Sequence, residues 1–168
     1  IENVQSVFFT VFMETGRSGE INAVTETLNN YNLERGAANF PVEVVLGTRR
    51  YVKIFAEFAL DASFQAELVL PEIEKAVGVN FGNPAGKEDQ SGLFSLYRRR
   101  FGKGEYARTI EGSVQNVAGV KWARVTAFNV FPAGDDPEII SLTSAANSLN
   151  NFVSCGNSEI LCLYYKHL

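Results

Sequence analysis

The sequence predicts an α+β protein, with helices packed on one side of a mostly antiparallel sheet. Residues 51–60 alternate apolar and mixed side chains, which is the period of a half-buried strand. Residues 69–77 and 106–117 instead repeat apolar side chains at helical spacing. A chain of 168 residues is long enough for one domain with a real core. We therefore expect a single α+β domain over residues 1–168.

The first part of the chain predicts a strand, a helix and a second strand. Val4–Met13 is dense in β-branched and aromatic residues, which favours a strand buried on much of both faces. Ser18 is expected to cap the helix, and the asparagine-rich segment 29–32 to end it, because asparagine side chains compete for backbone hydrogen bonds. Val42–Leu46 is the second strand. The apolar stripe of the helix consists of Ile21, Val24, Leu28 and Tyr31.

The middle of the chain predicts its clearest strand and a second helix. Within Tyr51–Leu60 the even-numbered residues form one apolar face. Asp61 or Ser63 is expected to cap the helix that follows, whose buried stripe spans residues 69–77. Pro71 lies inside this helix and should kink or split it, because proline lacks a backbone N–H and crowds the preceding turn.

The last part of the chain predicts a loop, a third helix and two long strands. Gly82–Gly92 is rich in turn-forming residues, so we expect an exposed loop there. The third helix should bury a stripe over residues 106–117 and stop at Gly119, where we expect a positive φ. The other expected elements are strands over Leu93–Tyr97, Val120–Phe131 and Ile160–Tyr165, a turn at Pro132–Pro137 and a short helix over Leu142–Phe152.

Composition argues against several classes of function. The net charge of −4 disfavours a general nucleic-acid binder, which would be basic. No apolar run approaches the about 18 residues of a membrane span, so we expect no membrane insertion. The single histidine, His167, is a poor platform for a metal site or a catalytic triad. We expect Cys155 and Cys162 to be reduced, and we expect no catalytic residue, metal, cofactor or small-molecule substrate.

Gly102–Ala107 matches the G-x-G-x-x-A pattern of a dinucleotide-binding turn at the start of a helix. Its context disfavours that function. The preceding strand would end in three arginines, whereas a central parallel strand is apolar. The following strand over Val120–Phe131 contains no acidic residue to bind a ribose. The pattern therefore favours a simpler role, in which Gly102 and Gly104 make a turn and start a helix.

Arg98, Arg99 and Arg100, followed by Phe101, form the sharpest charge cluster in the sequence. One interpretation is a solvated edge strand, whose charges discourage aggregation. The other is a docking patch for an acidic neighbouring subunit. The thirteen Phe and six Tyr residues exceed what the core of a small domain usually needs, so we expect some rings to cover partner subunits.

Several segments follow one another in a characteristic order. A helix, I-N-A-V-T-E-T-L, leads into the strand Y-V-K-I-F-A-E-F-A-L-D and then the helix F-Q-A-E-L-V-L-P-E-I-E-K-A-V. After a loop come G-K-G-E-Y-A-R-T-I-E-G-S-V-Q, the passage N-V-A-G-V-K-W-A-R-V and the closing S-E-I-L-C-L. In this order and in its glycine-led helix, the chain resembles the C-terminal region of the baseplate J-like family. These are wedge proteins of contractile phage tails and related injection systems.

The resemblance implies a structural role in a tail baseplate and no catalytic residues. It implies a virion protein, assembled in the host cytoplasm, that contacts other baseplate and tail subunits and associates with itself in a ring. Members of the family are usually longer and this chain begins at Ile1, so we expect a processed chain or a fragment of a longer wedge protein. Two alternatives stay open: an intracellular α+β ligand-binding or regulatory module, and a nucleotide-binding enzyme that uses Gly102–Ala107.

Overall fold

The computed structural model of the protein describes residues 7–11, 18–35, 42–78, 92–95, 97–131 and 149–163. Helix makes up about 33% of it and strand about 39%, which confirms the α+β class. The chain divides into two compact units, unit 1 (residues 1–48) and unit 2 (residues 49–168). The expectation of one domain over residues 1–168 stays a prediction.

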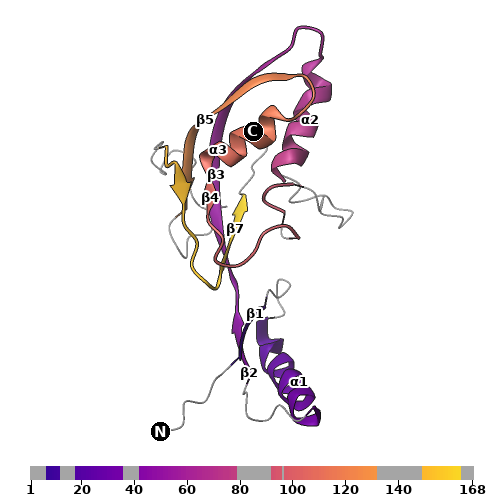
Figure 1. Ribbon diagram of the computed structural model, residues 1–168, viewed down its shortest axis with the longest axis vertical. Coiled ribbons are helices and arrows are strands. Elements are labelled where there is room, and N and C mark those ends of the chain that lie inside the picture. The colour runs from indigo at the N-terminus through magenta and orange to yellow at the C-terminus, as the bar shows by residue number, and fades with distance from the viewer. Residues whose placement is uncertain are drawn as a thin grey trace. The chain divides into compact units, whose positions relative to one another are not determined.

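Unit 1 contains a strand–helix–strand motif. In chain order its elements are β1 (Val7–Val11), the 3₁₀ turn η1 (Ser18–Glu20), helix α1 (Ile21–Glu34) and β2 (Val42–Leu46). Figure 1 shows α1 lying beside the two strands. The strands pair in parallel, and the Gly47 N–H extends the pairing by donating to the Val11 carbonyl at 2.8 Å. A parallel pair needs a crossover connection, and α1 lies within that connection.

Strand β1 is much less buried than the sequence predicts. Val7, Phe8 and Phe9 are all exposed, and Phe8 keeps 65% of its surface accessible. For the described part of Val4–Met13, the prediction of a strand buried on much of both faces is therefore wrong. The physical reason is that the described part of unit 1 contains one α-helix, and that helix packs mainly against β2.

Helix α1 runs further than the sequence predicts. The Asn29 amide accepts a hydrogen bond from the Val42 N–H at 3.1 Å and donates one to the Val42 carbonyl at 3.4 Å. Because this side chain bonds to β2 instead of competing for the backbone of its own helix, the helix continues to Glu34. The N-cap is Glu20, without a capping side chain, so the prediction of a Ser18 cap is wrong. Tyr31 is exposed and lies outside the half-buried face.

Unit 2 is built on a three-stranded sheet in the order β5–β3–β7. The strands of unit 2 are β3 (Thr48–Leu60), β4 (Glu105–Tyr106), β5 (Val120–Val130), β6 (Phe152–Val153) and β7 (Glu159–Leu163). β3 and β5 are antiparallel, with Thr126 and Lys121 inserted as extra residues at two shifts of register. β4 and β6 form a second antiparallel pair. The predicted apolar face of β3 is confirmed except at Ala56, which is exposed next to one of the shifts.

Helices α2 (Ala66–Val77) and α3 (Ala107–Gln115) pack together against one face of this sheet (Figure 1). The predicted buried stripe over residues 69–77 is confirmed. In α3, burial of Ile110 and Val114 is confirmed, whereas Tyr106 is exposed and Ala107 is buried in its place. The buried core consists of Val52, Val69, Ile73, Val77, Phe94, Ala107, Ile110, Val114, Val125, Phe128, Val153, Leu161 and Leu163.

Helix α2 begins and continues differently from the prediction. Its N-cap is Gln65, so neither Asp61 nor Ser63 caps it. The Asp61 carboxylate instead accepts hydrogen bonds from the Ser63 hydroxyl and N–H at 2.6 and 2.9 Å, and these bonds lower the pKa of Asp61. Pro71 lies inside the helix without splitting it, so α2 is one element over Ala66–Val77.

The segment predicted as a strand over Leu93–Tyr97 forms turns in its described residues. Its backbone forms hydrogen bonds with the C-terminal end of α2. The Leu93 and Phe94 N–H groups donate to the Ala76 and Val77 carbonyls, each at 2.9 Å. These bonds satisfy carbonyls that a helix end otherwise leaves unpaired. They also hold Phe94 in the core, where it is fully buried.

Two of the remaining predicted elements are confirmed and one is partly wrong. The strands over Val120–Phe131 and, in its described part, Ile160–Tyr165 are confirmed. The helix predicted over Leu142–Phe152 is wrong at its described end, where Phe152 belongs to β6. The turn at Pro132–Pro137, most of the loop at Gly82–Gly92 and His167 lie outside the described residues.

Gly119 connects α3 to β5 in the backbone conformation that the sequence predicts. Its φ is +93°, in the left-handed region that favours glycine. A β-carbon at this position would lie 2.7 Å from the Phe64 ring and 3.0 Å from a methyl group of Val69. Helix α3 itself ends earlier, at Gln115, so Gly119 turns the chain into the strand and does not cap the helix.

We predict that Gly119→Val destabilises the protein by about 2–5 kcal/mol, because it adds left-handed strain to overpacking. Thermal and urea unfolding measure this loss. Gly112→Ala is the matched control, since a β-carbon on Gly112 meets no atom within 4 Å. In a helix interior this change should stabilise by about 0.5–1 kcal/mol. Equal melting temperatures for Gly119→Val and the parent protein would contradict the prediction.

Candidate functional site

The predicted docking residues Arg98, Arg99, Arg100 and Phe101 do not form a strand, so the interpretation as a solvated edge strand is wrong. Arg98 and Arg100 are exposed, and Phe101 is half-buried. Arg99 is buried, with 6% of its surface accessible. The triplet is therefore divided, and its central arginine is turned away from any docking partner.

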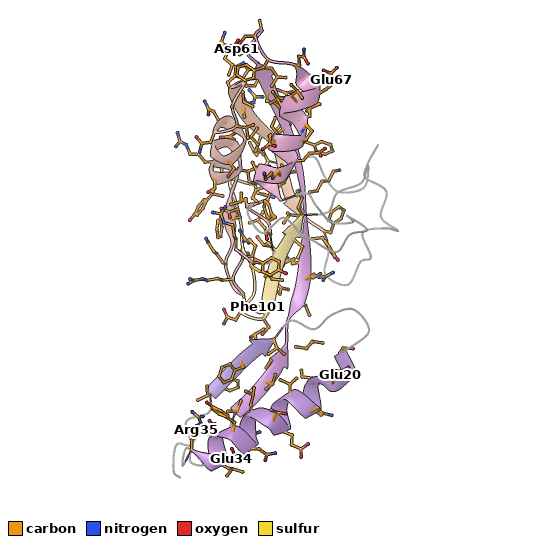
Figure 2. The ribbon with its side chains drawn as sticks, turned by 90° about the vertical axis from the view of Figure 1, so that its right-hand side faces the viewer. Glu20, Glu34, Arg35, Asp61, Glu67 and Phe101 are labelled. Carbon is orange, nitrogen blue, oxygen red and sulfur yellow. The ribbon has the colours of Figure 1, made fainter. Side chains whose placement is uncertain are left out.

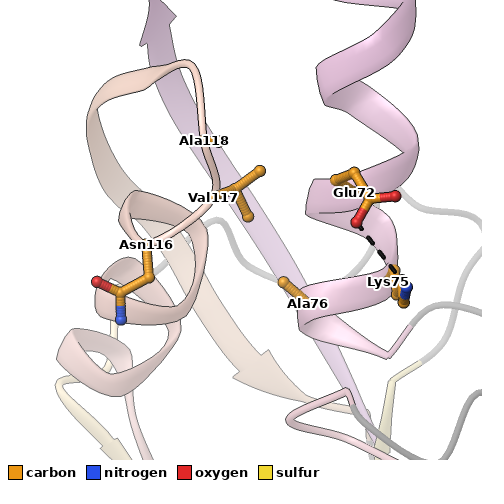
Figure 3. Close-up of a pocket in the computed structure, with 6 residues that line it drawn as sticks. All are labelled: Glu72, Lys75, Ala76, Asn116, Val117 and Ala118. Carbon is orange, nitrogen blue, oxygen red and sulfur yellow. Dashed lines mark ion pairs between the residues drawn. The ribbon is translucent and has the colours of Figure 1, made fainter.

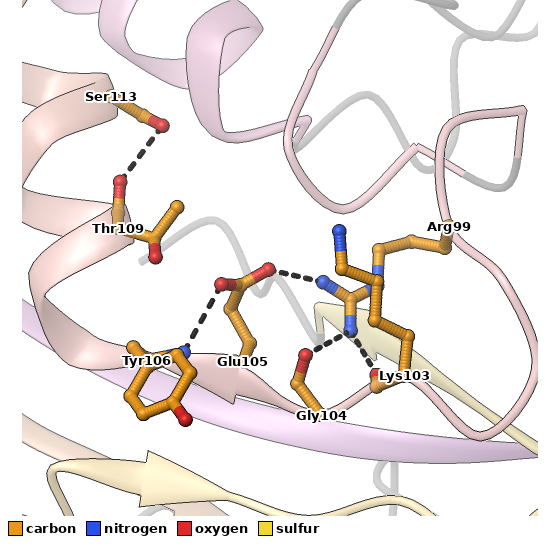
Figure 4. Close-up of polar contacts among 7 residues, drawn as sticks. All are labelled: Arg99, Lys103, Gly104, Glu105, Tyr106, Thr109 and Ser113. Atoms are coloured by element: carbon orange, nitrogen blue, oxygen red, sulfur yellow. Dashed lines mark hydrogen bonds and ion pairs between the residues drawn. The ribbon is translucent and has the colours of Figure 1, made fainter.

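Arg99 forms a buried ion pair with Glu105 (Figure 4). The guanidinium also donates to the Lys103 carbonyl and to the Gly104 carbonyl, the latter at 3.3 Å, and it lies 5.3 Å from the centre of the Phe94 ring. The second oxygen of Glu105 accepts the Tyr106 N–H at 3.1 Å. The pair thus fixes the turn before α3. No sequence pattern singled out Glu105, which lies six residues after its partner.

The glycines of the G-x-G-x-x-A pattern serve packing within the chain. Gly102 has a φ of +72°, and its N–H donates to the Glu159 carbonyl at 3.0 Å. A β-carbon on Gly104 would lie 2.4 Å from the Phe152 ring and 2.5 Å from the Val153 carbonyl oxygen. Both glycines therefore allow the turn to approach the segment 152–159, which is a structural reason for the pattern.

The two amides that lead into α3 already have partners inside the protein. The Tyr106 N–H donates to the Glu105 carboxylate, and the Ala107 N–H donates to the Asn151 carbonyl at 3.0 Å. A pyrophosphate at a dinucleotide site would need amides of this kind. The geometry therefore favours the interpretation of Gly102–Ala107 as a turn and helix start.

A second polar cluster joins β3 and β7. The Glu159 carboxylate accepts hydrogen bonds from the Gly156 N–H at 2.8 Å and from the Arg50 guanidinium at 3.0 Å, and these bonds lower its pKa. The Cys155 thiol donates to the Glu159 carbonyl at 3.0 Å, and partial burial raises the pKa of that thiol. Cys155 and Cys162 form no disulfide with each other. A protonated, hydrogen-bonded thiol is a poor nucleophile.

A cavity of about 340 Å³ lies between α2 and the end of α3 (Figure 3). Its lining consists of Glu72, Lys75, Ala76, Asn116, Val117 and Ala118. Glu72 and Lys75 pair with each other at 3.9 Å, and half or more of each side chain is exposed. The cavity therefore offers an apolar wall beside a self-neutralised ion pair, and this arrangement points to no particular ligand.

The surface carries many aromatic side chains that the sequence did not single out. Among the described residues the exposed aromatic side chains are Phe8, Phe9, Tyr31, Phe55, Phe64, Tyr97, Tyr106, Trp122 and Phe152. Tyr106 and Phe152 lie opposite each other on β4 and β6, and their ring centres are 4.6 Å apart. The high Phe and Tyr content predicts exposed rings in general. Which rings are exposed depends on long-range pairing that the composition does not reveal.

Within the described ranges, no group of three or more His, Cys, Asp or Glu residues is placed to hold a metal ion. The helices in this part of the chain are also too short or too polar to cross a membrane. The chain matches no protein-family model and has no significant match among curated protein sequences.

We predict that Arg99→Met destabilises unit 2 by about 3–5 kcal/mol, because it leaves the Glu105 carboxylate buried without its partner. Urea unfolding measures this loss. The double variant Arg99→Met/Glu105→Gln should lose at least about 1 kcal/mol less than the two single variants combined. Arg100→Met is the matched control and should change stability by less than about 0.5 kcal/mol. Parent-like unfolding of Arg99→Met would show that the ion pair contributes nothing.

We also predict a pH dependence from Glu159, whose pKa lies below its ordinary value of 4.5 in the folded protein. The ionised carboxylate contributes its full stability above pH 4.5, the ordinary pKa of the group. This contribution is lost as the pH falls through the lowered pKa of the folded state. Glu159→Gln removes this contribution, so its unfolding free energy should fall less steeply with acidification. Urea titrations from about pH 6 downward test this, and parallel curves for the two proteins would contradict it.

Proposed function

We propose that the chain is a structural wedge subunit of the baseplate of a contractile tail, from a phage or a phage-like injection system. It acts through protein–protein interfaces and not through catalysis. Its partners are other baseplate and tail subunits and further copies of the chain. Its place is the tail baseplate of the virion, assembled in the host cytoplasm. The resemblance in the order of elements and the exposed aromatic residues support this proposal.

The observation that carries the proposal is the open apolar surface of β1. In the parallel register, Phe8 shares a sheet face with Glu43 and Val45, all three of which are exposed. Parallel sheets are normally covered on both faces, and exposed edge strands normally carry charged residues or proline. Val7–Val11 has neither. A strand of this composition is typical of a surface that another subunit covers.

The small core of unit 1 supports the same role. Among its described residues only Val42 and Gly47 are buried, and α1 buries none of its residues fully. A unit of 48 residues buries a small fraction of its surface and is marginally stable alone. Association with another subunit would supply the missing burial and stabilise the folded form.

We predict that the tagged chain, produced in its native host, is recovered in tail particles together with sheath, tube and spike subunits. Phe8→Ser should lower this recovery, on the order of 30-fold, because truncating an aromatic anchor at an interface costs about 2 kcal/mol or more. Quantitative mass spectrometry of purified particles measures the recovery.

Leu68→Ser is the matched control. Leu68 is as exposed as Phe8, at 69%, but lies on α2 of unit 2. Its substitution should leave recovery within about twofold of the parent. Absence of the parent chain from tail particles would contradict the baseplate role, and equal losses for both variants would contradict the role of β1.

A further inference from the structure

The charges of the chain are divided unevenly between its two units. Unit 1 contains six acidic and two basic residues, which gives a net charge of −4, and unit 2 contains thirteen of each, which gives 0. The described acids of unit 1, Glu20, Glu26, Glu34 and Glu43, are all exposed. Figure 2 shows Glu20 and Glu34 at opposite ends of α1. Unit 1 therefore presents acidic residues along its helix.

Unit 2 has a surface of the opposite sign. We define the basic surface as Arg98, Arg100, Lys103 and Arg108, which are all exposed. The one acid between Arg98 and Arg108 is Glu105, and Arg99 neutralises it inside the protein. The side chains of Arg100, Lys103 and Arg108 make no hydrogen bond or ion pair with any described residue. These three side chains therefore carry positive charge that no described residue compensates.

Two exposed aromatic rings lie on, or pair with, the segment 98–108 that carries the basic surface. Tyr106 and Phe152 face each other across the β4–β6 pair, with 58% and 45% of their surfaces accessible. Phe152 covers Gly104, which adjoins Lys103, and Tyr106 is two residues before Arg108. Arginine and aromatic side chains together are typical of the energetically important part of protein interfaces. The segment therefore carries both the charged and the aromatic side chains that a protein partner needs.

We propose that the basic surface of unit 2 binds the acidic unit 1 of a second copy of the chain, in a head-to-tail contact. Two basic surfaces repel each other, as do two acidic units, so opposite charges favour the head-to-tail orientation. A contact between two different surfaces is heterologous, and it closes into a ring or continues as a filament. The inference rests on the proposed assembly role and names the surfaces by which the chain would associate with itself.

A polyanion such as nucleic acid is the competing occupant of the basic surface. It is disfavoured because every copy also carries the acidic unit 1, which would repel a polyanion brought nearby. A second copy satisfies both surfaces at once. The test therefore has to distinguish self-association from binding of a polyanion.

The test uses two charge-reversal variants of the full chain. Arg100→Glu/Arg108→Glu changes the charge of the four-residue basic surface from +4 to 0, and Glu26→Lys/Glu34→Lys changes the net charge of unit 1 from −4 to 0. All four positions are exposed. Glutamate in the first turn of α3 and lysine in the last turn of α1 both suit the helix dipole, so the variants should fold. Circular dichroism and melting temperature verify that they do.

Sedimentation velocity of the purified proteins at low salt measures self-association. The parent should associate, and each variant alone should associate at least about tenfold more weakly. Mixing the two variants should restore association into pairs, because the unaltered acidic unit 1 of the arginine variant then meets the unaltered basic surface of the glutamate variant. The control Lys121→Glu/Arg124→Glu, which changes the net charge of unit 2 by the same amount, should behave like the parent.

A monomeric parent, a parent-like arginine variant or a mixture that stays dissociated would each overturn the proposal. Binding of a fluorescent single-stranded oligonucleotide that depends on Arg100 and Arg108, without self-association, would assign the surface to a polyanion instead. These outcomes concern the purified chain alone. The chain can still be recovered in tail particles when it does not associate with itself in solution. The baseplate role and the head-to-tail contact are therefore tested separately.

Discussion

The buried ion pair between Arg99 and Glu105 is the interaction on which the organisation of unit 2 most depends. Removing two charges from water costs several kcal/mol, and only their mutual contact and further hydrogen bonds offset this cost. The chain therefore has to bring the Lys103 and Gly104 carbonyls to the guanidinium and the Tyr106 N–H to the carboxylate. These contacts fix the turn before α3. The same turn aligns β4 with β6, and so places α3 against the sheet.

The elements that the sequence predicts well are those whose pattern is local. The alternation of Tyr51–Leu60 and the helical spacing over residues 69–77 indicate which side of each element faces the core. The positive φ of Gly119 follows from a helix pattern that must turn into a strand within a few residues. None of these predictions requires knowledge of which element packs on which. They therefore agree with the structure, apart from Ala56, which is exposed beside a register shift in β3, and from shifts of a few residues at element ends.

The predictions that fail concern side chains whose role is set by distant residues. Arg99 belongs to a triplet that is typical of surface charge, and nothing in the sequence shows that Arg99 and Glu105 are buried together as an ion pair. Asn29 is a helix-ending residue by local preference, but the nearby backbone of Val42 gives its amide a better partner. Val7–Val11 has the composition of a buried strand, yet the described residues of unit 1 form one α-helix and leave most of the strand exposed. Composition predicts that apolar surface will be covered, but not whether the cover comes from the same chain.

The open strand and the divided charges have complementary roles in the proposed assembly. An apolar strand such as Val7–Val11 can contribute affinity, but apolar contacts alone discriminate poorly between partners and orientations. The acidic residues of α1 and the cations around Tyr106 discriminate by sign, because like surfaces of two copies repel. The ion pair of Arg99 is a precondition for this, since it removes the only acid from the segment that carries those cations. Thus one buried contact both fixes the fold of the turn and leaves a surface of a single sign outside it.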